Sequence, residues 1–238
     1  MKWEVQLNGD TDDLRELAKS LTKDDLCITE RNGQFFLETT RFSGLTTIEE
    51  LRSAASDLLS ILTGAVRLSL GGRTPLQIAN IAKVREDGTR DIFGSMSATI
   101  QVKVSCGGKI TRSDGTVEVI NPADKVPIWV NVALKDLKDT SVKKALQLLG
   151  IYKHSWVSLY RLYEVIEEDV GGIDKIANEG WATKKAIKLF KRTANSPGAI
   201  GHLARHGKEY TTSPSDPMDL GEAVALVKVI LHNWLRSK

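Results

Sequence analysis

The first half of the chain alternates between two kinds of hydrophobic pattern. Every second residue is apolar over 2–7, which predicts a half-buried strand, and helical spacing of apolar residues begins at Thr11. Two strands are expected around Asn32-Gly33, because an Asn-Gly pair between apolar runs is typical of a tight hairpin. The remaining predicted elements are a long helix that begins at a Thr-x-x-Glu capping box in 46–50, and strands near 78–84 and 92–104.

This order of elements is β-α-β-β-α-β with extra strands, which favours a ferredoxin-like α+β domain over 1–130. Residues 105–127 are rich in turn-forming residues and predict a short hairpin, with one strand at 116–120, before the domain boundary. Because ferredoxin-like folds carry many unrelated functions, this prediction says nothing about what the domain does.

Helical patterns replace strand patterns after about residue 134, so we expect an all-α helical bundle over 134–238. Apolar residues at helical spacing predict a helix over 155–170, which Gly171-Gly172 would end, and a short turn of helix follows at 173–177. The other two predicted helices are one capped by Thr183 and a last one that begins after Pro217, with Asp219 as its cap and Glu222 as the reciprocal carboxylate.

Composition indicates where in the cell the protein is found. No apolar run approaches the length of about 18 residues that a membrane helix needs, and the charged start of the chain is unlike a signal peptide. Cys27 and Cys106 lie far apart and predict neither a zinc site nor a disulfide framework. We therefore expect a cytoplasmic protein that does not bind membranes and that carries no metal or other cofactor.

Positive charge is concentrated in the second half. Residues 1–133 carry 16 Lys and Arg against 18 Asp and Glu, whereas residues 134–238 carry 17 against 12. An anionic partner would therefore meet the helical domain. Five cations lie between Ala182 and Asn195 with no acidic residue among them. They either form a solvated face or bind along a phosphate backbone. Four of them are expected on one helix face, namely Lys184, Lys188, Lys191 and Arg192.

The stretch 194–207 concentrates polar residues between two helical patterns. If 201–206 were helical, His202 and His206 would share one face, but no third ligand is evident and we predict no metal there. Arg205 beside His206 suits an anion, since Arg offers a planar fork of donors and His can move a proton. In the alternative interpretation, Arg205 pairs with a carboxylate and His206 donates to a carbonyl, and the acidic helix end at 164–169 answers the basic run in salt bridges.

Three segments carry a resemblance to known proteins: Leu7-Asn8-Gly9-Asp10, Trp181-Ala182 and Ala204-Arg205-His206-Gly207. With them the chain resembles, over nearly its whole length, a family of uncharacterised bacterial two-domain proteins. That resemblance implies a soluble, cytoplasmic bacterial protein. The helical half is also distantly similar to the HEPN superfamily of bacterial toxins and phage-defence proteins. Its catalytic members are metal-independent ribonucleases with an Arg four to six residues before a His, whereas here Arg205 directly precedes His206.

Three functional hypotheses follow. The first is a non-enzymatic binding, sensor or adaptor protein, acting in phage defence, whose helical domain binds RNA, a nucleotide or a protein partner. Its candidate binding residues are Lys184, Lys188, Lys191, Arg192, Arg205 and His206. The second is a HEPN-like ribonuclease with Arg205 and His206 in general acid–base roles. The third is a structural subunit of a larger complex.

Overall fold

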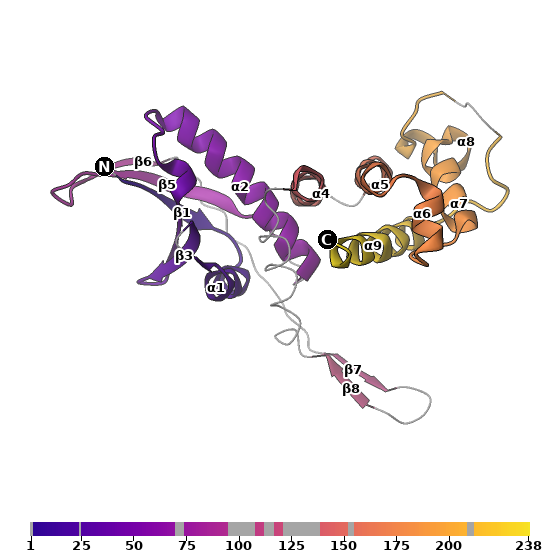
Figure 1. The fold of residues 1–238 in the computed structure, drawn as a ribbon, viewed down its shortest axis with the longest axis horizontal. Coiled ribbons are helices and arrows are strands. Elements are labelled where there is room, and N and C mark those ends of the chain that lie inside the picture. The colour runs from indigo at the N-terminus through magenta and orange to yellow at the C-terminus, as the bar shows by residue number, and fades with distance from the viewer. Residues whose placement is uncertain are drawn as a thin grey trace. The chain divides into compact units, whose positions relative to one another are not determined.

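The computed structural model describes residues 2–23, 25–69, 74–94, 108–111, 117–120, 139–151, 155–208 and 212–238. It is a mixed α+β structure, as the sequence predicts. Contacts between residues divide the chain into two compact units, Met1–Asn131 and Val132–Lys238, which are coloured indigo to magenta and orange to yellow in Figure 1. Each unit is described by itself below.

The first unit builds an antiparallel sheet with two main helices. The sheet has the strand order β2-β3-β4-β1-β5-β6. The predicted strands at 2–7 and 78–84 and the predicted long helix are all present. In chain order the elements are β1 (Lys2–Asn8), α1 (Thr11–Ser20), β2 (Thr22–Lys23), β3 (Leu26–Arg31), β4 (Gln34–Thr39), η1 (Thr40–Phe42), α2 (Ile48–Ser69), β5 (Gln77–Val84) and β6 (Arg90–Gly94).

The predicted hairpin turn and the predicted helix cap are both formed by residues that are close together in the sequence. Asn32 and Gly33 have φ angles of 53° and 73°, and they turn the chain so that Arg31 pairs with Gln34 in the β3–β4 hairpin. The predicted capping box is formed by Thr47 and Glu50, each of which accepts a hydrogen bond from the other's backbone N–H. These residues fix the hairpin and the start of α2 without help from distant parts of the chain.

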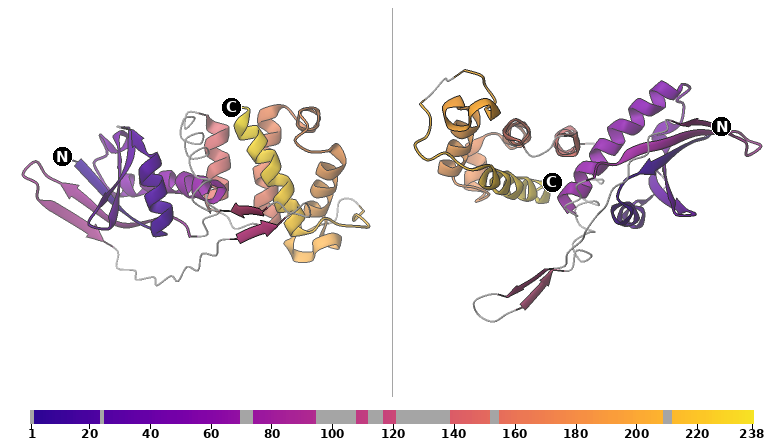
Figure 2. Two further views of the ribbon diagram at one scale, coloured as in Figure 1. Left: turned by 90° about the horizontal axis from the view of Figure 1, so that it is seen from below. Right: turned by 180° about the vertical axis from the view of Figure 1, so that it is seen from behind.

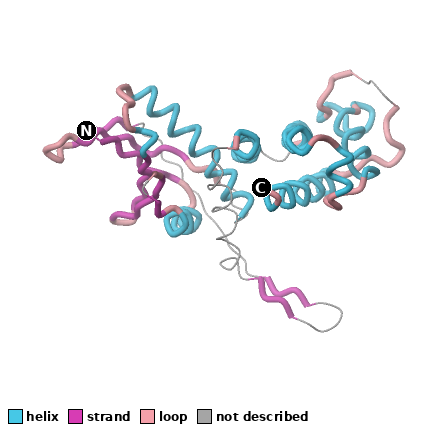
Figure 3. The backbone as a smooth tube through the Cα atoms, viewed as in Figure 1, coloured by secondary structure: helices cyan, strands magenta, loops and turns pink. Residues whose placement is uncertain are grey.

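The two faces of the sheet differ in chemistry because successive side chains of a strand point to opposite sides. One face is apolar and buried, and it carries Val5, Leu37 and Ile81, each 0% exposed. Helices α1 and α2 contact this sheet at β3 and β5, and they add their own buried leucines to the core. The helix and strand colours of Figure 3 separate these two layers. The alternate positions, which include Glu4 and Arg31, form the second face.

Part of the sequence prediction lies outside the described residues. The strand predicted at 92–104 is described only as far as Gly94, and Cys106, His154 and the boundary near 130–134 are not described. The predicted hairpin within 105–127 is present as β7 (Gly108–Thr111) paired antiparallel with β8 (Val117–Ile120).

The regular secondary structure in the described residues of the second unit is all helical. None of the helices described in either unit is both long and apolar enough to cross a membrane. The sequence did not predict the first helix of this unit. The elements are α4 (Thr140–Ile151), α5 (Trp156–Val170), α6 (Ile173–Asn178), α7 (Lys184–Asn195), α8 (Pro197–Ile200), η3 (Gly201–Leu203) and α9 (Leu220–Arg236).

An aromatic cluster holds α7 against α5. Phe190 of α7 is fully buried, and its ring centroid lies 5.7 to 6.2 Å from the rings of Trp156, Tyr160 and Tyr163, all on α5. Trp234 of α9, also fully buried, completes the core, and α9 runs beside α5 in the views of Figure 2.

A charged clamp joins the ends of three of these helices. Lys238 Nζ lies 2.7 Å from Asp139 Oδ2 and 2.7 Å from Asp169 Oδ2. Asp139 also caps α4 by accepting from the backbone of Val142, and the indole N–H of Trp234 donates to Asp169. The hydrogen bond from Lys238 lowers the pKa of Asp139. Burial alone would raise the pKa of Asp169, but the bonds from Lys238 and Trp234 hold it below its ordinary value.

We expect the second unit to lose stability as the pH falls through the lowered pKa values of Asp139 and Asp169. A carboxylate whose pKa is lower in the folded state contributes stability above its unfolded pKa, about 4, and loses it on protonation. Lys238→Met removes the clamp and should cost about 1 kcal/mol near neutral pH. Urea unfolding between about pH 3 and pH 7 measures both effects.

The control for Lys238→Met is Lys228→Met, which removes an exposed lysine from the preceding helix α9. Wild type and the control should lose stability together as the pH falls, and Lys238→Met should lose less because its clamp is already absent. Equal losses in all three proteins would contradict the clamp.

Candidate anion-binding surface of the helical unit

Helix α7 carries the predicted basic run. The Thr183 hydroxyl caps it by accepting from the backbone N–H of Ala186, as the sequence indicated. Ile187, Phe190 and Ala194 are fully buried on the inner face. The outer face is exposed, and its cations are Lys184, Lys185, Lys188 and Arg192.

Lys184 is engaged at the first turn. Its Nζ lies 2.6 Å from Asp174 Oδ1 of α6, with both side chains at least half exposed. The hydrogen bond and the positive charge of Lys184 lower the pKa of the Asp174 carboxyl. The Lys184 side chain is therefore exposed to solvent, but the carboxylate of Asp174 balances its charge.

Lys191 turns toward α5. Its Nζ lies 3.0 Å from Glu167 Oε2 and 5.4 Å from the centre of the Tyr163 ring. The Tyr163 hydroxyl donates to the same Glu167 carboxylate, at 2.9 Å, and both burial and this bond raise the Tyr163 pKa. Lys184, Lys188, Lys191 and Arg192 were expected on one helix face, and the ion pair with Glu167 places Lys191 at the edge of that face nearest α5.

Arg192 is fixed without being neutralised. Its Nη2 donates to the Thr212 carbonyl at 2.9 Å, and the residue is exposed. A carbonyl oxygen has no formal charge, so the guanidinium keeps its full positive charge while its position is restrained. Lys185 and Lys188 lie on the same outer face and are exposed.

Arg205 faces α5. It forms an ion pair of 3.0 Å with Glu164, its guanidinium carbon lies 4.4 Å above the Tyr160 ring, and its backbone N–H donates to Ala194. Its Nη1 lies 3.5 Å from Nε2 of His206, which is half-buried. The alternative interpretation of Arg205, in which a carboxylate pairs with it, is confirmed. So is the expected salt-bridge cluster between the acidic end of α5 and the cations that follow it.

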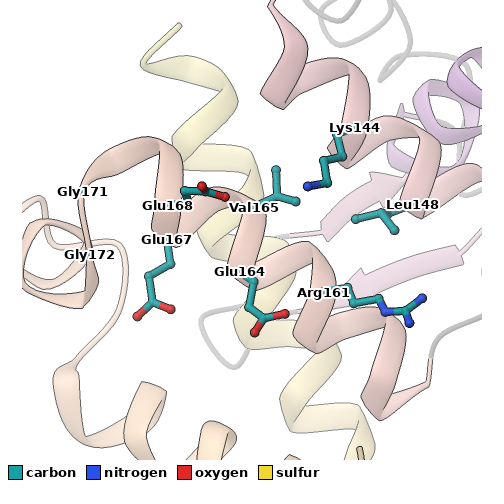
Figure 4. Close-up of a pocket in the computed structure, with 9 residues that line it drawn as sticks. All are labelled: Lys144, Leu148, Arg161, Glu164, Val165, Glu167, Glu168, Gly171 and Gly172. Atoms are coloured by element: carbon teal, nitrogen blue, oxygen red, sulfur yellow. The ribbon is translucent and has the colours of Figure 1, made fainter.

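A hollow of about 790 Å³ lies beside α4 and α5. Figure 4 shows three glutamates along α5, with Lys144 and Leu148 on the neighbouring helix α4. Two of the three carboxylates are already committed, Glu164 to Arg205 and Glu167 to Lys191. The hollow thus lies over the salt-bridge cluster, with charges of both signs in its lining.

The polar stretch after α7 forms a helix connection. Residues 204–206 are not helical, so the condition under which His202 and His206 would share a helix face is not met. No group of three or more metal-ligating side chains occurs in the part of the chain that the structure describes. Asn195 bonds the nearby backbone, as expected for a residue at a helix end, by donating to the Lys191 carbonyl at 2.8 Å.

Comparison with known proteins adds no relatives. No family model matches the chain, and no match was found among the curated proteins or the solved structures. The resemblances to a family of bacterial two-domain proteins and to HEPN proteins therefore remain predictions.

Sequence reasoning thus found the basic helix but not its outward set of cations. Lys185 belongs to the basic run but not to the four cations of the predicted face. The structure exposes it on the same outer face as Lys188 and Arg192. The signal that could have separated these residues is the position of Phe190, since the residues opposite the most buried side chain must face solvent.

We expect Arg205 and Glu164 to be energetically coupled. The two side chains are 29% and 40% exposed, so solvent screens the pair and the coupling should be about 0.5 kcal/mol. Arg205→Ala should cost more than that, about 1–2 kcal/mol, because it also removes packing on Tyr160. Urea unfolding of Arg205→Ala, Glu164→Gln and the double variant gives the coupling.

Lys208→Ala, at an exposed position, is the matched control and should change the free energy of unfolding by less than about 0.5 kcal/mol. Strictly additive effects of Arg205→Ala and Glu164→Gln would show that the pair contributes nothing to stability.

Proposed function

We propose that this protein is a non-enzymatic binding protein whose helical unit binds RNA through the phosphate backbone. The observation that carries the proposal is the outer face of α7, where Lys185, Lys188 and Arg192 are exposed and none is paired with a carboxylate in the contacts described above. We call Lys185, Lys188 and Arg192 the basic face of α7. Arg205, also a candidate binding residue, is left out of this face because it forms an ion pair with Glu164.

The spacing of the basic face suits a chain of phosphates. Lys185 and Arg192 are seven residues apart, which is about 10 Å along a helix that rises about 1.5 Å per residue. A strand within a duplex presents a phosphate about every 3.4 Å along the helix axis, and a single strand can extend further, so each of the three cations can meet a different phosphate. Phe190, the aromatic residue between them in the sequence, is fully buried, so this face offers no ring for base stacking and the contacts would not distinguish bases.

The ion pair of Arg205 with Glu164 weighs against the ribonuclease alternative. An arginine that stabilises a transition-state charge must turn its guanidinium to the substrate, whereas this one is turned to α5. Binding without cleavage is therefore the better supported function.

For the first unit we infer the ferredoxin-like class. The inner strands lie in the order β3-β4-β1-β5, with a helix after β1 and another before β5, which is the order of a split βαβ arrangement. Under this inference β2 and β6 are additions at the sheet edges. For the second unit we infer a helical bundle, supported by the packing of α5 against α4, α7 and α9.

The RNA proposal is tested by fluorescence anisotropy of a labelled single-stranded RNA at low salt. The variant replaces Lys185, Lys188 and Arg192 by Gln, because Gln at 192 can still donate to the Thr212 carbonyl. It should bind at least about tenfold more weakly than wild type. The slope of log affinity against log salt should fall by about 2, since each lost phosphate contact to a single strand contributes about 0.7.

A second triple variant, Lys144→Gln, Lys175→Gln and Lys228→Gln, has the same net charge and should bind as wild type does. The proposal is wrong if wild type fails to bind RNA at low salt, or if both triple variants weaken binding equally. RNA recovered in fragments at the end of the titration would contradict the non-enzymatic part of the proposal.

A further inference from the structure

The second face of the sheet in the first unit is hollowed. The cavity measures about 280 Å³, and its residues alternate along the strands with the buried core residues Val5, Leu37 and Ile81. It therefore lies on the face away from the apolar core. Its lining includes Glu4 and Gln6 of β1, Arg31 of β3, Phe36 of β4, Asn80 of β5 and Arg90 of β6.

A buried carboxylate lies at the centre of this face. Glu4 is 7% exposed, and its two oxygens accept from Arg31 Nη1 at 2.9 Å and from Arg90 Nε at 3.2 Å. Arg31 also pairs with Glu38 at 3.3 Å, and Glu38 pairs with Lys2, so three cations against two carboxylates leave this cluster with an excess of one positive charge. The Arg90 side chain is 51% exposed, so this excess charge is accessible to an anionic ligand.

A flat surface lies next to the charge. The guanidinium carbon of Arg31 lies 4.1 Å from the centre of the Phe36 ring, and the Arg31 side chain is 39% exposed. A guanidinium held over an aromatic ring can stack a planar ligand on its other side. Nucleobases bind proteins in this way.

An amide pair completes the lining. Asn80 Nδ2 donates to Gln6 Oε1 at 2.8 Å, which uses one of the two donors of Asn80 and leaves the Gln6 amide group with its own donors. The neighbouring position on β6 is Gly94, where a Cβ would lie 2.7 Å from Asn80 Oδ1. Glycine at 94 therefore leaves the space that the Asn80 amide occupies. Amide groups of this kind recognise the edges of bases.

We propose that this face of the sheet binds one nucleotide, with the phosphate at Arg90, the base stacked on Arg31 and the base edge hydrogen-bonded by Gln6 and Asn80. A cavity of about 280 Å³ lies near the lower end of small-ligand pockets, about 300 Å³, so its ligand would be no larger than one nucleotide. Both a free nucleotide and one unit of a single-stranded RNA have this chemistry. The proposal does not rest on RNA binding by α7, because it uses other residues in the other unit.

The full-length protein is titrated with AMP, GMP, CMP and UMP by isothermal calorimetry. At least one nucleotide should bind with a Kd below about 1 mM, and ribose 5-phosphate should bind at least about tenfold more weakly because it has no base to stack. Arg90→Gln should weaken nucleotide binding at least about tenfold. Ile92→Glu, at a rim position that is 68% exposed and tolerant of charge, should do the same by repelling the phosphate.

The matched control is Arg85→Gln. Arg85 precedes the same β5–β6 turn and pairs with Asp91 at 2.8 Å, but it does not line the cavity, so binding should be unchanged. Variants of the basic face of α7 should also bind mononucleotides as wild type does. The site is wrong if no nucleotide binds, if ribose 5-phosphate binds equally well, or if Ile92→Glu binds normally. Among positive results, a trinucleotide that binds much more tightly than its monomer assigns the site to RNA, and equal affinities assign it to free nucleotides.

Discussion

Phe190 determines where every charge on α7 lies. Its ring is fully buried among three aromatic rings of α5, so the inner face of the helix cannot rotate. Because a helix repeats every 3.6 residues, fixing one face fixes the others. Lys191, the next residue along, is carried toward Glu167, whereas Lys188 and Arg192 are carried to solvent. The candidate RNA surface is thus a consequence of core packing.

The same core decides which charges are neutralised. Lys184, Lys191 and Arg205 each meet a carboxylate from α5 or α6, and Glu167 also accepts from the hydroxyl of Tyr163, whose ring packs on Phe190. Exposed and half-exposed ion pairs of this kind add little to stability, but they remove cations from the set that a phosphate can reach. A count of lysines and arginines along the helix therefore overstates its capacity to bind anions.

The sequence predicted the parts of the fold that depend on neighbouring residues. The turn at Asn32-Gly33 and the caps at Thr183 and Asp219 need only a few adjacent side chains, and all are present. Helix α4 carried a readable signal that was missed, since Val142, Ala145, Leu146 and Leu149 have helical spacing and Asp139 caps them. The sequence predicted that Arg205 could pair with a carboxylate but not that its partner is Glu164, because 41 residues separate the two and only the packing of the helices brings them together.

The buried carboxylate of Glu4 contributes little to the stability of the fold. A carboxylate that is 7% exposed loses most of its hydration, and two arginines are needed to compensate for that loss. Replacing such a buried group of charges by apolar residues is often neutral or stabilising. Stability alone therefore does not require a carboxylate at position 4. Glu4 instead orients both guanidinium groups at the floor of the cavity, one against Phe36 and the other at the rim. An arrangement that costs desolvation energy and fixes two exposed arginines is better explained by a ligand than by the fold.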